Sequence, residues 1–138
     1  MRANFPRNKR RRLTYMILAV SATLIVFAHN WWYSVERQAR KLGSREFTVQ
    51  AWAKAGQTQR AEMTASFLEQ YDVSGFHRKD IEALLGPQTS YYDYDTNLAY
   101  VVGPDTVRSM YASGYLLVFA ADKYDGEIDS VFFFPDVE

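Results

Sequence analysis

The chain has 138 residues and no cysteine, which excludes disulfides, thiolate metal sites and thiol nucleophiles. Its 16 basic and 16 acidic side chains give a net charge of zero, but they are unevenly distributed. Every charged residue before residue 13 is basic, whereas all 16 acidic side chains lie in residues 34–138. The roughly one hundred residues of that second part are enough for one small domain and not for two.

A long apolar segment follows the basic tail of residues 1–12. Residues 13–27 carry no charge, and a helix over residues 13–33 would be about 30 Å long, at about 1.5 Å per residue. The segment ends in aromatic residues of the kind that line membrane interfaces: Trp31, Trp32 and Tyr33. Three arginines directly precede it: Arg10, Arg11 and Arg12. This pattern predicts a single-pass inner-membrane helix with a cytoplasmic N-terminus, a bilayer contact and a periplasmic C-terminal domain.

Three other interpretations of this segment exist. A secretory signal peptide also has a basic start and an apolar stretch, and cleavage after Ala28 would fit one. A buried core helix would not explain the neighbouring arginines. The basic cluster could bind nucleic acid, but no nucleic-acid motif accompanies it, so we expect no nucleic-acid partner.

The remaining residues predict helices first and strands afterwards. Residues 34–56 are interpreted as a helical juxtamembrane stalk, in which Trp52 either packs on the domain or marks a partner contact. A helix over residues 59–70, capped by Thr58, is expected to follow. The next helix should begin at His77 as N-cap, with Asp80 at the capping-box position, and end at Gly86.

Beyond residue 87 the apolar pattern changes to the period of a strand. Residues 91–102 predict either one long strand or a hairpin that turns at residues 95–97. Residues 115–121 are almost wholly apolar, as in a central strand, and residues 128–134 form the predicted partner across a two-residue Asp125-Gly126 turn. The fold class is therefore α+β, with a transmembrane helix before a two-layer ααβββ domain (residues 57–138) whose helices cover one face of an antiparallel sheet.

Three stretches resemble the BamE-like (SmpA/OmlA) domain of small bacterial envelope proteins. They are KDIEALLGP at 79–87, YVVG at 100–103 and GYLLVFAADKYDGEIDSVFF at 114–133. The resemblance covers roughly residues 59–134 and implies an ααβββ fold. The same unit is similar to domains of β-lactamase-inhibitor proteins, so the resemblance implies binding to another protein.

No residue pattern predicts an enzyme, a metal site or a cofactor. Ser74, His77 and Asp80 are the residue types of a hydrolytic triad, but a helix cap explains the histidine, and a triad is recognised by its geometry across elements. Residues 93–104 begin like a calcium-binding loop but lack the required glycine and the final glutamate.

A tyrosine-rich segment is the best candidate for a binding surface. Its alternation places Tyr91, Asp93 and Asp95 on one side, which we expect to be exposed. Aromatic residues are enriched in protein interfaces, but the alternation alone equally fits an ordinary surface over a core. We therefore expect a non-enzymatic scaffold or assembly protein that binds another envelope protein. The alternative function is a periplasmic inhibitor or immunity protein that blocks a toxin or enzyme.

Overall fold

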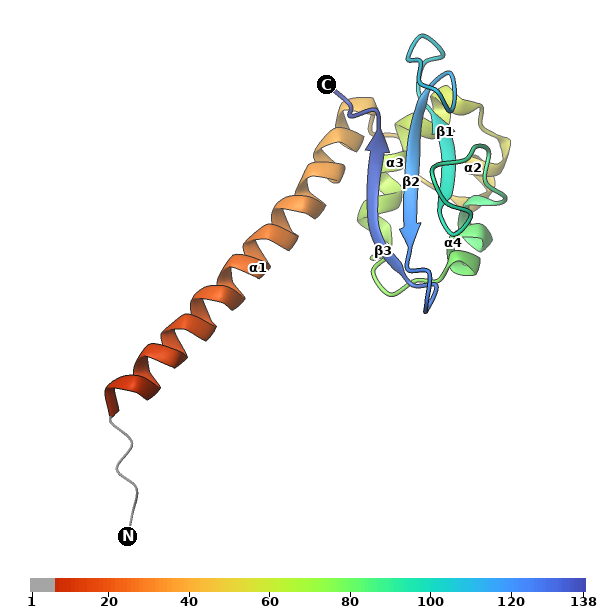
Figure 1. The fold of residues 1–138 in the computed structure, drawn as a ribbon. Coiled ribbons are helices and arrows are strands. Elements are labelled where there is room, and N and C mark those ends of the chain that lie inside the picture. The colour runs from red at the N-terminus through yellow and green to blue at the C-terminus, as the bar shows by residue number, and fades with distance from the viewer. Residues whose placement is uncertain (1–6) are drawn as a thin grey trace. The chain divides into compact units, whose positions relative to one another are not determined.

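The computed structural model describes residues 7–138, apart from the side chains of residues 7, 8 and 28–33. It divides into two compact units, Met1–Tyr33 and Ser34–Glu138. The second unit confirms the α+β class (Figure 1). The elements are α1 (Arg7–Leu42), α2 (Val49–Lys54), α3 (Gln57–Gln70), α4 (Arg78–Leu85), β1 (Leu98–Val102), β2 (Tyr115–Ala121) and β3 (Ile128–Phe134).

The first unit holds the N-terminal part of α1. Its hydroxyl groups bond back to the helix itself: Thr14 to the carbonyl of Arg10, Ser21 to that of Ile17 and Thr23 to that of Ala19. Such bonds satisfy polar groups without a partner outside the helix. Within the described residues, no helix has the length and apolar content that crossing a membrane requires.

Residues 34–56 are helical over most of their length, as predicted, but they do not form a stalk outside the domain. The segment is part of the second unit, because Val35, Ala39 and Phe47 are buried in its core. Helix α1 ends at Leu42, and Gly43 has a φ of +142°, which a side chain rarely adopts. A Cβ at this glycine would also lie 2.9 Å from the Cα of Glu62 on α3, so the chain turns here in close contact with that helix.

Helix α3 forms the layer behind the sheet. Gly56 is its N-cap, so the predicted cap at Thr58 is wrong by two residues. Gly56 adopts the extended backbone that a cap position requires, and glycine is accepted there. The ring of Phe67 packs edge-on against Phe119 of β2 at 6.0 Å, which anchors the helix to the sheet.

The short helix α4 begins as the sequence predicts. His77 is the N-cap, and its backbone N–H donates a hydrogen bond to the carboxylate of Asp80 at 2.8 Å. Ile81 is fully buried. The helix ends at Gly86, whose φ of +75° suits a glycine C-cap.

The sheet is antiparallel in the order β1-β2-β3. Val118 at the centre of β2 lies opposite Ala99 on one side and Phe132 on the other. The bounds of β2 and β3 are those predicted. Their connection is wider than the expected two-residue turn, because the N–H of Asp122 bonds to the carbonyl of Glu127 at 2.8 Å.

Strand β1 is shorter than predicted. It starts at Leu98, and residues 91–97 form a loop instead of a strand. The hairpin alternative is nearer to the structure, since Ser90 pairs antiparallel with Ala99 before the loop begins.

The two faces of the sheet are covered differently. Helix α3 lies behind one face, as Figure 1 shows, so the prediction of helices on one face is confirmed. The opposite face presents three buried residues, Ala99, Leu116 and Val118. Side chains from the loops and from β3 pack over these three residues.

Candidate functional site

The loop of residues 91–97 is held in one conformation by its own backbone. Asp93 has a φ of +54°, a left-handed conformation that is uncommon for any residue but glycine. The N–H of Tyr94 bonds to the carbonyl of Tyr92 at 2.7 Å, and the N–H of Asn97 bonds to the carbonyl of Tyr94 at 3.0 Å. These bonds turn the chain back toward β1 and break the strand alternation that the sequence suggests.

Asp93 is the centre of a small polar network on this loop. Its carboxylate accepts a hydrogen bond from the Tyr111 hydroxyl at 2.7 Å, and its backbone carbonyl accepts one from the Tyr91 hydroxyl. The first bond raises the pKa of Tyr111, because only the neutral phenol can donate to the carboxylate. The network therefore joins residues 91–97 to the loop between β1 and β2.

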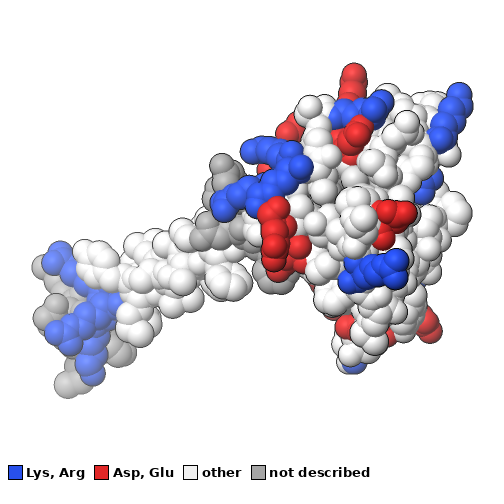
Figure 2. All heavy atoms as spheres, turned by 90° about the horizontal axis from the view of Figure 1, so that it is seen from above, with Lys and Arg blue, Asp and Glu red and all other residues white. Residues whose placement is uncertain are grey.

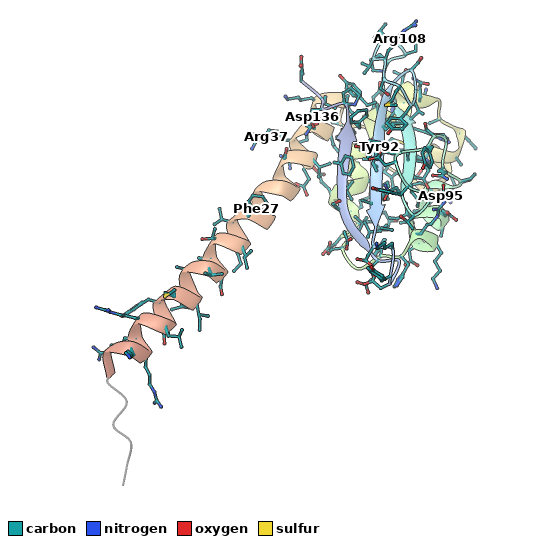
Figure 3. All side chains as sticks on the ribbon, in the orientation of Figure 1. Phe27, Arg37, Tyr92, Asp95, Arg108 and Asp136 are labelled. Carbon is teal, nitrogen blue, oxygen red and sulfur yellow. The ribbon has the colours of Figure 1, made fainter. Side chains whose placement is uncertain are left out.

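Four aromatic rings cover the open face of the sheet, and we call them the aromatic face: Tyr92, Tyr111, Phe132 and Phe134. The Tyr92 ring is central, with centroids 5.1 Å from Tyr111, 5.4 Å from Phe132 and 5.2 Å from Phe134. Figure 3 labels Tyr92 over the middle of the sheet. Burial raises the pKa of its hydroxyl. The rings remain partly exposed, so they present apolar surface beside the Asp93 network.

The structure places the predicted partner-binding residues in three different settings. Tyr91 is 44% exposed and lies beside the exposed Asp93, so both are exposed as expected, although the strand that was to expose them does not form. Asp95 is also exposed, but it lies toward the other end of the loop from Tyr91. There its backbone carbonyl accepts a hydrogen bond from Arg78 of α4.

Trp52 is not a surface residue: the alternative that it packs on the domain is confirmed, and its assignment to partner binding is wrong. Its side chain is 1% exposed, and its indole N–H donates to the carbonyl of Leu85 at 3.0 Å. The Tyr100 hydroxyl donates to the next carbonyl, that of Gly86, at 2.7 Å. Carbonyls at a helix C-terminus lack partners within the helix. The two aromatic side chains therefore supply the hydrogen-bond donors for the carbonyls at the end of α4.

Sequence reasoning missed three members of the aromatic face. Phe132 and Phe134 share the parity that faces away from α3, a signal that was present in the strand pattern. Tyr111 offered no such signal, because it lies in an irregular loop and meets Asp93 across 18 positions of sequence.

The residue types of a hydrolytic triad are not assembled into one. The Ser74 hydroxyl donates to the Asp72 carboxylate, which lowers the pKa of Asp72, and His77 and Asp80 form the start of α4. No group of three or more His, Asp or Glu side chains in the described part of the chain is arranged to hold a metal ion.

The predicted membrane-interface residues belong to α1. Arg10, Arg11 and Arg12 are exposed near its start. Figure 2 shows their charge followed by a stretch with neither basic nor acidic residues. The side chains of the aromatic group, Trp31, Trp32 and Tyr33, lie outside the described residues.

Comparison with known proteins gives no match to a family model, a curated protein or a solved structure.

Proposed function

We propose that this protein is a membrane-anchored, non-enzymatic docking protein of the bacterial cell envelope. In this proposal residues 13–33 hold the chain in the inner membrane and the second unit binds another envelope protein in the periplasm. The resemblance of residues 59–134 to BamE-like domains is consistent with such a role.

The observation that carries the anchor is the surface of α1 between Leu13 and Phe27. The large apolar side chains along this stretch are between 58% and 69% exposed. A helix that is apolar all round normally occurs inside a protein or in a lipid bilayer. The neighbouring arginines and the internally bonded hydroxyls favour the bilayer.

Docking is supported by the surface around Tyr91 and Asp93. An exposed tyrosine and a carboxylate lie beside partly exposed aromatic rings, and they are held in place by hydrogen bonds of their own loop. A rigid aromatic group loses little conformational freedom on binding, which is why such residues often dominate interface energies.

The anchor and its direction are tested with single cysteines, because the natural chain contains none. Asn4→Cys and Asp105→Cys are treated in intact spheroplasts with a membrane-impermeant maleimide. We expect labelling at position 105 only, and retention of the chain in membranes washed at about pH 11. Labelling at position 4, or release of the full-length chain by the wash, would contradict the anchor.

The docking surface is tested by pull-down of envelope proteins from crosslinked cells. The double variant Tyr91→Ala/Asp93→Ala should recover less of the partner than the natural chain, while circular dichroism shows an unchanged fold. The matched control changes exposed residues elsewhere, Lys54→Ala/Asp105→Ala. Equal recovery with both double variants would rule out this surface, and a single soluble toxin or enzyme as partner would favour the inhibitor function.

A further inference from the structure

A groove of about 310 Å³ lies between α2, the start of α3 and the end of α4. Its walls are mainly apolar, and they include the side chains of Val49, Ala53, Leu84 and Pro87. Among the described residues that line the groove, Arg60 of α3 alone carries a charge. The groove therefore combines apolar walls with a single cation.

Arg60 is held in place by Trp52 of α2. Its Nε–H donates to the backbone carbonyl of Trp52 at 3.1 Å, and its guanidinium carbon lies 5.1 Å from the centroid of the Trp52 ring. Trp52 is 1% exposed, so the cation rests on a fixed part of the core. Because the position of Arg60 is set in advance, a ligand that binds it loses little affinity to the ordering of this side chain.

The Arg60 guanidinium has no carboxylate partner in the described part of the chain. None of the ion pairs there includes it, and its two terminal amino groups make no hydrogen bond to a described residue. Partial burial lowers the pKa of Arg60, because the loss of water disfavours the charged form. A partly buried cation without a counter-ion is unfavourable, and an anion in the groove would offset that cost.

We propose that this groove binds a small apolar carboxylate, a short-chain fatty acid, with its carboxylate on Arg60. The two free amino groups of the guanidinium can donate parallel hydrogen bonds to one carboxylate, while the aliphatic walls cover the acyl chain. A volume of about 310 Å³ is at the small end of the range for ligand sites, which suits a small molecule better than a helix or strand of a protein. The inference is independent of the proposed docking function, because neither Tyr91 nor Asp93 lines this groove.

The test measures binding of hexanoate to the full-length chain in a neutral detergent by amide NMR. Hexanamide is the matched ligand, because it has the same chain without the charge and also controls for partition into the detergent. We expect saturable shifts of the backbone amide signals of Ala53 and Leu84 with hexanoate. Hexanamide should bind at least about fivefold more weakly, since it cannot form the charged pair with Arg60.

Three variants locate the site. Arg60→Gln should weaken hexanoate binding at least about tenfold, because it removes the cation. The control Arg108→Gln makes the same charge change at an exposed site outside the groove and should weaken binding less than about twofold. Ala83→Leu fills the groove from α4 and leaves the cation in place, so it should weaken binding at least about threefold. Circular dichroism checks the fold of each variant.

Equal affinity for hexanoate and hexanamide would overturn the proposal, and so would equal weakening by Arg60→Gln and Arg108→Gln. Shifts that do not saturate, or an affinity that Ala83→Leu leaves unchanged, would show that the groove is not the site. Tighter binding of a capped peptide of sequence LEL than of hexanoate would identify a protein segment as the occupant and would also contradict the proposal.

Discussion

The two faces of the sheet use aromatic residues for different purposes. On the side of α3, Tyr100 and Phe119 are fully buried and meet Phe67 and Trp52 from the helices. On the other side, Tyr92 and Tyr111 come from loops and stay partly exposed. The comparison indicates that the first face supplies stability, whereas the second has surface left for a partner.

Hydrogen bonding follows the same division. The side chains of Trp52 and Tyr100 donate to the carbonyls of Leu85 and Gly86 at the end of α4, in a buried and a partly buried hydrogen bond respectively. The Tyr111 hydroxyl donates to the exposed carboxylate of Asp93, where water can compete for the hydrogen bond. Substitutions on the two faces should therefore separate stability from binding.

The largest effect is expected from Trp52→Ala. The change removes a fully buried ring and leaves the Leu85 carbonyl without its donor. Loss of a buried aromatic side chain typically costs about 3–5 kcal/mol of unfolding free energy. Urea unfolding of the full-length chain checks this, and a loss below about 1 kcal/mol would contradict the core position of Trp52.

Tyr100→Phe should give the next largest effect on the same face. The ring and its packing remain, but the Gly86 carbonyl loses the hydroxyl at 2.7 Å. Loss of such a partly buried hydrogen bond typically costs about 0.5–1.5 kcal/mol of unfolding free energy. The same urea titration measures the loss, and Tyr94→Phe, on an exposed ring, is the control that should leave the midpoint unchanged.

Stability should also fall at alkaline pH. Burial raises the pKa of Tyr100, and the bond to Asp93 raises that of Tyr111, above the value of about 10 in an unfolded chain. The stabilisation is complete below that value and decreases as the pH rises through the folded-state pKa values. Unfolding at successive pH values from 9 upward tests this prediction. A flat profile above about pH 10 would contradict it, and Tyr100→Phe should reduce the slope.

These substitutions also bear on what the sequence could predict. The strands β2 and β3 follow from an apolar run and its alternating partner, and the start of α4 follows from His77 and Asp80. These signals are local, so the sequence contains them in full. The error at residues 91–97 arose because alternating Tyr and Asp residues imitate a strand, while the left-handed backbone of Asp93 and its bond to Tyr111 are set by tertiary structure.

The packing of Trp52 was predicted only as one of two alternatives, and its contacts were not predicted, for a related reason. Its short helix, α2, lies in a region that composition marks as a connector, and its donor meets Leu85 across 33 positions of sequence. Local periodicity does not contain such contacts.

The smallest effect on global stability is expected from Tyr111→Phe. The ring stays on the aromatic face, but the loop of residues 91–97 loses its bond to the neighbouring loop. We expect faster amide hydrogen exchange at Tyr94 and Asn97 with little change in the urea midpoint. Tyr124→Phe, which alters a highly exposed ring, should leave both exchange rates as they are. Unchanged exchange in Tyr111→Phe would show that the Asp93 bond does not order the loop.

The most direct test of docking is photocrosslinking in intact cells with a photoreactive amino acid at position 91 or at position 54. Tyr91 borders the aromatic face, whereas Lys54 is exposed on α2. The account predicts a discrete crosslinked product with an envelope protein from position 91 and none from position 54. The same product from both positions, or a product from position 54 alone, would contradict it.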